Sequence, residues 1–284
     1  MGTSHWSDDF YRDREVERAR TGATVFTHHA ATAAAPRKER HVHEKMDPKK
    51  VNRESRDSDA HPESVAFGLV LDVTGSMQDT PKVMQRNLPG LMDAIKRAGI
   101  AHPQILFGAV GDHRSDAVPL QVGQFESGLE MEDDLGRVFM EGGGGPSYEE
   151  SYQEALYFFA RHTSIDCFEK RGRKGYLFVV GDEHAYPSVT KSEAETLFGD
   201  TLQDDMPLAD VVAEAQAKYE VYFIIPGGTN HGRDPELRRA WEELLGADHV
   251  IMLADAANIC SAVAAAITGR PADVASNARS VRLI

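Results

Sequence analysis

The sequence predicts an α/β fold: a doubly wound, mostly parallel sheet flanked by helices, in the Rossmann-like manner. Apolar runs of strand length alternate with amphipathic helical segments from residue 63 to residue 268. Several of these runs are apolar throughout, which is typical of strands that are covered on both faces. Repeated alternation of strands and helices favours one parallel sheet with helices on both sides.

The expected strands are rich in β-branched and aromatic side chains and end at polar residues or glycine. They fall at residues 65–72, 104–110, 118–125, 175–180, 221–225 and 249–252, with 118–125 expected at the edge of the sheet. The expected helices carry apolar residues along one face. They fall at residues 82–97, 129–140, 147–161, 192–198, 208–219, 236–245 and 256–268. Pro89 predicts a kink or a restart in the first of these helices.

Both ends of the chain differ in composition from this body. Residues 1–62 hold 12 Lys and Arg against 11 Asp and Glu, with few large apolar side chains. Such a segment buries too little surface to offset the ordering of its backbone, so we expect a charged, flexible N-terminal extension with short helices. The alternative is that it wraps the domain or folds onto a partner. Residues 269–284 form a polar C-terminal tail. Residues 63–268 are therefore expected to make the folded domain.

Composition also excludes several classes of function. A net charge of −14 argues against a general nucleic-acid binder, which needs a basic face to displace counterions. The two cysteines, Cys167 and Cys260, give no disulfide framework. The first residues lack the pattern of a signal peptide, and no apolar run approaches the ~20 residues that span a bilayer. We expect a cytoplasmic protein whose partners are neither nucleic acid nor membrane.

Polar side chains follow the first expected strand. Residues 69–77 read Leu-Val-Leu-Asp-Val-Thr-Gly-Ser-Met, which puts Asp72, Thr74 and Ser76 at alternate positions after an apolar run. Ligands of open α/β sheets gather at the carboxyl ends of strands. One carboxylate and two hydroxyls can surround a hard cation such as Mg²⁺, which takes oxygen ligands. The same pattern also fits a strand end whose hydroxyls bond only to backbone amides.

This stretch resembles the metal-ion-dependent adhesion motif, Asp-x-Ser/Thr-x-Ser, of von Willebrand factor type A domains. That family adds a second loop with an oxygen ligand and a third loop with an Asp after an apolar strand. Residues 141–147 read Glu-Gly-Gly-Gly-Gly-Pro-Ser, and residues 176–182 read Tyr-Leu-Phe-Val-Val-Gly-Asp. The resemblance covers residues 64–268. It implies that the ion is held by one set of side chains, Asp72, Thr74, Ser76, Ser147 and Asp182.

The second loop departs from the family pattern, because four glycines precede Ser147 where two are usual. Ser147 is therefore a candidate ligand and also a candidate N-cap of the helix that follows. In the second case Glu150, three residues on, would complete a capping box. No Gly-Lys-Ser/Thr follows the glycines, which excludes a P-loop.

The resemblance implies recognition rather than chemistry. If neutral hydroxyls dominate the inner shell, the ion keeps much of its charge, and a Glu or Asp of a partner protein completes its coordination. We expect Mg²⁺, although Mn²⁺ and Ca²⁺ accept the same oxygen ligands. Stand-alone intracellular members of bacteria often work beside MoxR-type AAA+ ATPases, which suggests a class of partner.

Two other functions are compatible with the sequence. Asp112 and His113 follow one expected strand, and Asp182 and His184 follow another. If these pairs are neighbours, they could build a hydrolytic metal centre, which requires His113 or His184 within reach of the metal. The third function is structural: an oligomer-forming protein in which the ion only stabilises the fold. In that case Asp72→Ala would lower the melting temperature and leave partner binding unchanged.

Overall fold

The computed structural model describes residues 4–77, 79–143 and 147–269. A six-stranded sheet crosses it in the order β12-β11-β7-β2-β3-β4. All neighbouring strands are parallel except β4, which pairs antiparallel with β3 at the edge. The strands of this sheet are β2 (Val65–Asp72), β3 (Pro103–Val110), β4 (Leu120–Val122), β7 (Gly175–Val180), β11 (Tyr219–Pro226) and β12 (Val250–Leu253). The α/β class and the edge position of the third expected strand are confirmed.

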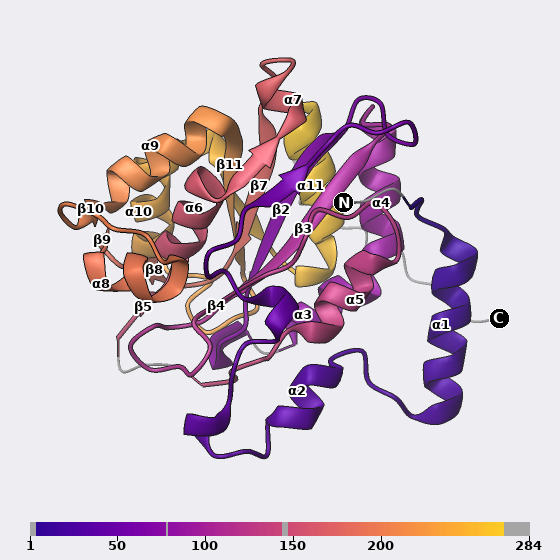
Figure 1. The fold of residues 1–284 in the computed structure, drawn as a ribbon, viewed down its shortest axis with the longest axis horizontal. Helices are drawn as coiled ribbons and strands as arrows, with labels where there is room; N and C mark the ends of the chain where they lie inside the picture. Colours follow the sequence, from indigo (N-terminus) through magenta and orange to yellow (C-terminus); the bar gives the residue numbers. More distant parts are fainter. Residues whose placement is uncertain (1–3, 78, 144–146, 270–284) are drawn as a thin grey trace.

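Helices cover both faces of the sheet (Figure 1). Successive side chains of a strand point to opposite faces, so Val70 of β2 packs in the core cluster of α6, α9 and α10, while Leu69 packs in the cluster of α3, α4 and α11. The helices are α1 (Asp8–Thr21), α2 (Thr27–Thr32), α3 (Thr80–Arg86), α4 (Leu88–Arg97), α5 (Glu130–Arg137), α6 (Tyr152–Arg161), α7 (Asp166–Glu169), α8 (Lys191–Glu193), α9 (Leu208–Lys218), α10 (Pro235–Leu245) and α11 (Ile259–Thr268).

The order of strands reverses its direction between β2 and β7. From β2 the chain continues to β3 on one side, whereas from β7 it continues to β11 on the other. In doubly wound sheets the crevice at such a switch point, beyond the carboxyl ends of the strands, is where ligands bind. Asp72 is the last residue of β2, and Asp182 lies two residues beyond the end of β7.

Two helical segments test the expectations drawn from the sequence. The restart expected at Pro89 is confirmed, because α3 ends at Arg86 and Pro89 lies in the first turn of α4. The helix expected from residue 147 begins only at Tyr152. The preceding strand β5 (Glu149–Glu150) pairs with β8 (His184–Ala185), and this pairing keeps the backbone extended up to Glu150.

Residues 4–62 pack against the body of the molecule, where we expected a flexible extension. The α1 helix stands beside α5 in Figure 1 and buries Tyr11, whose hydroxyl donates to the carbonyl oxygen of Gln85 at 2.8 Å. Phe26 and Met46 are buried in a small cluster with Val73. The short strand β1 (Arg53–Ser55) pairs with β6 (Thr163–Ile165).

Charge explains why so polar a segment can dock. Glu132 on α5 is almost completely buried, and Arg14 and Arg18 of α1 reach its carboxylate at 3.2 and 2.7 Å. A buried carboxylate is costly unless it is paired, so these arginines couple α1 to the body. The C-terminal tail expected at residues 269–284 lies outside the described residues beyond Gly269.

Candidate metal centre

Two loops meet over the carboxyl ends of β2 and β7. The amide of Gly75, in the turn after β2, donates to the carbonyl oxygen of Gly143 at 2.5 Å, and the amide of Gly142 donates to that of Val73 at 3.1 Å. A Cβ at position 75 would lie 3.0 Å from the oxygen of Gly143. The close approach of the glycine-rich loop to the motif turn therefore depends on a glycine at position 75.

Four of the five predicted site residues form one hydrogen-bonded chain. The Thr74 hydroxyl donates to Asp72 Oδ1 at 2.6 Å, and the Ser76 hydroxyl donates to Asp182 Oδ1 at 2.7 Å. The two hydroxyl oxygens lie 3.2 Å apart. All four side chains are buried. Because each hydroxyl donates its hydrogen bond to an aspartate, its oxygen lone pairs remain available to a cation.

Ser147 lies apart from this chain. Its hydroxyl oxygen is 3.3 Å from the hydroxyl of Tyr186, and within residues 4–77, 79–143 and 147–269 it makes no hydrogen bond to the other four. The prediction that Ser147 caps the following helix is wrong. The α6 helix begins at Tyr152 with Ser151 at its N-cap position, because β5 separates Ser147 from the helix.

Three further groups at this site were not predicted from the sequence. Glu150, Glu183 and Tyr152 are buried there, and the Tyr152 hydroxyl donates to Asp72 Oδ2. The Oε2 atoms of both glutamates have no hydrogen-bond partner in the described part of the chain, and neither has Oδ2 of Asp112. Buried carboxylate oxygens without donors are rare in folded proteins and call for a positive partner.

Burial raises the pKa of three of these carboxyl groups. The pKa of Asp72 rises to about 7, although hydrogen bonds from Thr74 and Tyr152 oppose the rise. The pKa of Glu183 rises to about 8 and that of Glu150 to about 10, and the charge of Asp72 adds to burial in both. Loss of water disfavours the carboxylate form, as does a neighbouring negative charge. Without a cation, the cluster therefore retains protons at neutral pH.

His231 joins the same cluster from the loop after β11. Its backbone amide donates to Asp182 Oδ2 at 3.1 Å, and its Nδ1 lies 3.3 Å from Glu183 Oε1. Ligand atoms of Asp182, Glu183 and His231 all lie within 4.8 Å of one another. The Glu183 backbone is fixed by Trp241, whose indole N–H donates to its carbonyl oxygen at 3.0 Å. No sequence motif pointed to His231, since its position depends on this loop alone.

Two exposed side chains, Tyr148 and Arg114, lie near the buried cluster. Tyr148 is 68% exposed and its ring meets that of His231 edge to face at 4.9 Å. On the other side, the Arg114 guanidinium lies 3.9 Å from the ring centre of Tyr186. The Tyr186 hydroxyl in turn donates to Asp112 Oδ1 at 2.9 Å. A rim of aromatic and cationic groups thus borders the carboxylates.

The two histidines of the hydrolytic alternative have other contacts in the described residues. Asp112 contacts Tyr186, whereas His113 Nδ1 lies 2.8 Å from Glu154 on α6. His184 belongs to β8, where its amide donates to the carbonyl oxygen of Tyr148. Across the described ranges, His184 joins no group of side chains that could hold a metal.

The donor set fits a hard divalent cation. Hydroxyl and carboxylate oxygens come from the carboxyl end of β2, the loop after β7 and strand β5. Several of the carboxylate oxygens lack other partners among the residues that the structure describes. Mg²⁺ and Ca²⁺ take such oxygen ligands. Asp72, Thr74, Ser76 and Asp182 would hold the ion, with Glu150 and Glu183 within the same cluster.

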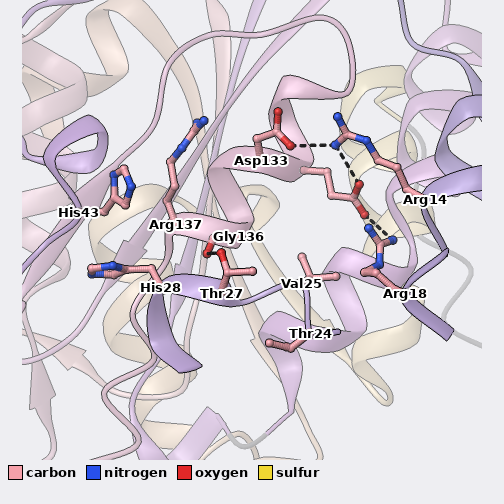
Figure 2. A pocket seen from close by; sticks show the side chains of 11 residues that line it. Arg14, Arg18, Thr24, Val25, Thr27, His28, His43, Asp133, Gly136 and Arg137 are labelled. Carbon is pink, nitrogen blue, oxygen red and sulfur yellow. Dashed lines mark hydrogen bonds and ion pairs between the residues drawn. The ribbon is translucent and has the colours of Figure 1, made fainter. Parts of the chain in front are cut away.

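A hollow of about 530 Å³ lies between α1, α2 and α5, lined by Arg14, Arg18, Arg137 and two histidines (Figure 2). Arg14 is already paired with Asp133 at 2.8 Å, and Arg18 is paired with Glu132. Since the arginines have carboxylate partners within the protein, their charge does not single out an anionic ligand.

Among the described residues, no helix is long and apolar enough to cross a membrane. No family model matches the chain, and no curated protein matches it.

A solved structure of an adhesin shows a similar fold at low sequence identity. A crystal structure of the pilus adhesin SpaC from Lactobacillus rhamnosus GG has a TM-score of 0.51 and 12% identity, covering 78% of this chain and 32% of that chain. Proximal thread matrix protein 1 of the mussel byssus has a TM-score of 0.46 and 8% identity, covering 78% of this chain and 46% of that one. This chain thus spans about a third of the length of the adhesin. At such identities the likeness to the adhesin concerns the fold alone.

Proposed function

We propose that this protein binds a partner protein through a divalent cation held at the carboxyl ends of β2 and β7. One observation supports this more than any other: buried carboxylate oxygens of Asp112, Glu150 and Glu183 that have no hydrogen-bond partner in the described residues. Glu150 and Glu183 lie close enough to Asp72 for its charge to raise their pKa values. Mg²⁺ is the proposed ion, with Mn²⁺ and Ca²⁺ as alternatives of the same ligand chemistry.

The hydroxyls determine what the site would do. Thr74 and Ser76 offer neutral oxygen ligands. Each hydroxyl is oriented by an aspartate to which it donates a hydrogen bond. With these hydroxyls as direct ligands and the aspartates acting through them, the bound cation supplies a positive centre whose charge the direct ligands only partly neutralise. A carboxylate from outside, a Glu or Asp of the partner, is the group that this centre favours.

The rim supports a protein partner rather than a small acid. Tyr148, His231 and Arg114 lie at the surface beside the cluster. Tyrosine and arginine are enriched at protein–protein interfaces, where they contribute much of the binding energy. The resemblance to von Willebrand factor type A domains, and to members that act with MoxR-type AAA+ ATPases, suggests where to seek the partner.

Affinity capture tests this function. Purified protein is incubated with lysate of its source cells in Mg²⁺ and again in EDTA, and captured proteins are identified by mass spectrometry. We expect a partner that is captured only in Mg²⁺, that is lost with Asp72→Asn, and that is retained with Asp57→Asn. The second variant is a matched loss of charge at a residue that accepts a hydrogen bond from Ser64, just before β2 begins. The same catch in both buffers would contradict a cation-bridged function.

The structural alternative gives a different result in the same experiment. If the ion only stabilises the fold, Asp72→Asn lowers the melting temperature in Mg²⁺ but leaves the captured proteins unchanged.

A further inference from the structure

A second group of metal-ligating side chains lies beside α6, and we call it the His113 cluster. It consists of His113 from the loop after β3, Glu154 of α6 and Glu193 of α8. One ligand atom of each lies within 4.8 Å of the others. None of the three belongs to the hydroxyl–aspartate chain or to the group that contains His231.

Glu154 is the unusual member of this cluster. Its side chain is completely buried, yet neither carboxylate oxygen makes a hydrogen bond within the described ranges. His113 Nδ1 lies 2.8 Å from Oε1, a contact that is an ion pair only when the imidazole is protonated. Even an aligned imidazole N–H would satisfy only one of the two oxygens. A fully buried carboxylate in this state lacks a positive partner that can serve both oxygens.

The other two ligands are held in place by their own contacts. The backbone amide of His113 donates to the Ser151 hydroxyl at 2.8 Å. Glu193 closes a capping box with Thr190, in which Oε2 accepts from the Thr190 amide at 2.7 Å. Oε1 of Glu193 is therefore the oxygen free of this capping contact. Such outer contacts orient the ligands of metal sites in proteins.

We propose that the His113 cluster binds a transition-metal ion, with His113, Glu154 and Glu193 as its protein ligands. An imidazole nitrogen suits Zn²⁺ and its neighbours in the first row better than Mg²⁺, which prefers oxygen alone. For bonds of about 2.0–2.2 Å, tetrahedral ligand atoms lie about 3.3–3.6 Å apart. Ligand atoms within 4.8 Å of one another need only side-chain adjustments to reach that spacing. Three protein ligands leave a fourth position for water.

The two centres would thus select different ions. The centre between β2 and β7 offers hydroxyl and carboxylate oxygens, whereas the His113 cluster offers nitrogen and oxygen. The alternative for the His113 cluster is a buried His–Glu ion pair without a metal, which uses the same side chains and makes a different prediction.

Zinc titration of the full chain separates these possibilities. Protein freed of metal with a chelator is saturated with Mg²⁺ and then titrated with Zn²⁺ by calorimetry, and bound zinc is counted by elemental analysis after gel filtration. We expect the wild-type protein to bind one equivalent of zinc. In His113→Gln and in Glu154→Gln the affinity of this zinc should be at least about tenfold weaker, so that it is lost on gel filtration. It should persist in His231→Gln, which alters the other centre. The matched control is Glu195→Gln, an exposed carboxylate two residues from Glu193.

Cobalt provides a measurement on the unmodified protein. Co²⁺ bound by one imidazole and two carboxylates should give a visible absorption band that Zn²⁺ abolishes and excess Mg²⁺ does not. Zinc binding that is equal in wild type, His113→Gln and Glu154→Gln, or no such band with Co²⁺, would overturn the proposal and leave a buried ion pair. Loss of the equivalent in His231→Gln alone would instead assign the zinc to the other centre.

Discussion

Two acidic groups near the opposite ends of β2 behave in opposite ways: Asp57, which is partly exposed before the strand, and Asp72, which is buried at its end. Just before the strand, Asp57 accepts hydrogen bonds from Arg171 and Ser64, and these outweigh burial, so its pKa falls to about 2. At its end, roughly 25 Å away along the strand, burial raises the pKa of Asp72 to about 7. The contrast shows that burial alone does not set the pKa of a carboxyl group. The two positions differ in whether the protein supplies a cationic side chain that pairs with the carboxylate.

Near the start of β2, arginine and lysine side chains of the protein pair with the carboxylates. Asp166, next to Asp57, is also paired, with Arg56 at 2.9 Å and Lys170 at 2.6 Å. At the other end, hydroxyls and one histidine contact the carboxylates, and no arginine or lysine of the described residues pairs with Asp72 or Asp182. The first end is built for stability, and the second has the composition of a site that receives an ion.

The largest expected effect is on Mg²⁺ affinity and concerns the carboxyl end of β2, where no arginine or lysine of the described residues pairs with the aspartates. Asp72→Asn and Asp182→Asn should each weaken Mg²⁺ binding at least about 100-fold by calorimetry, because loss even of an outer contact commonly costs 10–100-fold. Asp57→Asn should leave that affinity unchanged, although it removes the same charge. Equal Mg²⁺ affinity in all three variants would contradict the assignment of the ion site to the carboxyl end of β2.

The next effect concerns the paired end. Asp57→Asn should lower the free energy of unfolding at pH 7 by about 1–3 kcal/mol, since a carboxyl with a depressed pKa stabilises the fold above its ordinary pKa. That contribution disappears as the pH falls through about 2. Urea denaturation of the variant and of wild type should therefore converge between pH 4 and pH 2. A difference that persists in acid would mean that packing, not charge, holds this end.

A smaller effect should appear when the metal-free protein is made more alkaline. A carboxyl with a raised pKa, such as Glu150 at about 10, binds its proton more tightly when folded than when unfolded. Stability is then highest below the ordinary pKa and falls as pH rises toward the folded value. Between pH 6 and pH 8.5 we expect a loss of roughly 1–3 kcal/mol in EDTA. The measurement is denaturant unfolding across this range.

Mg²⁺ and one variant serve as controls for that measurement. A bound cation replaces the protons, so saturating Mg²⁺ should flatten the pH dependence, and Glu150→Gln should flatten it in EDTA. A metal-free stability that rises with pH over this range would contradict the assignment of a raised pKa to Glu150.

The smallest effect is expected at Ser147. Its hydroxyl contacts Tyr186 and lies outside the hydrogen-bonded chain of the site. Ser147→Ala should therefore change Mg²⁺ affinity by less than about threefold, while Ser76→Ala, which removes a member of that chain, should cost about tenfold or more. A larger loss at Ser147 than at Ser76 would restore Ser147 as a ligand.

Sequence patterns predict the centre of this molecule well. Strands buried on both faces read as unbroken apolar runs, and polar residues directly after them share one edge of the sheet. That is why the pattern predicts Asp72, Thr74 and Ser76 at one strand end, while the resemblance to von Willebrand factor type A domains implied that Asp182 joins them. The pairing of β5 with β8 is only two residues long, too short to leave a periodic signal. It places Glu150 in the cluster and moves the start of α6 away from Ser147.

The N-terminal segment shows a second limit of composition. Its average composition is polar, but its packing against the rest of the protein depends on single residues such as Tyr11 and Met46, each fully buried. The buried partner of its arginines, Glu132, lies more than a hundred residues away in the sequence. Averages over sixty residues cannot register such long-range pairs.

Gly68, in the middle of β2, has a consequence for how this sequence can vary. A Cβ there would overlap the ring of Phe159 and lie 2.8 Å from a methyl carbon of Leu177. Phe159 belongs to α6, the same helix that carries Tyr152 and Glu154. Any larger residue at position 68 would push that helix off the sheet and disturb both carboxylate centres at once. In a saturation library selected for ion binding, we expect this position to accept glycine alone, although it touches no ligand of either centre.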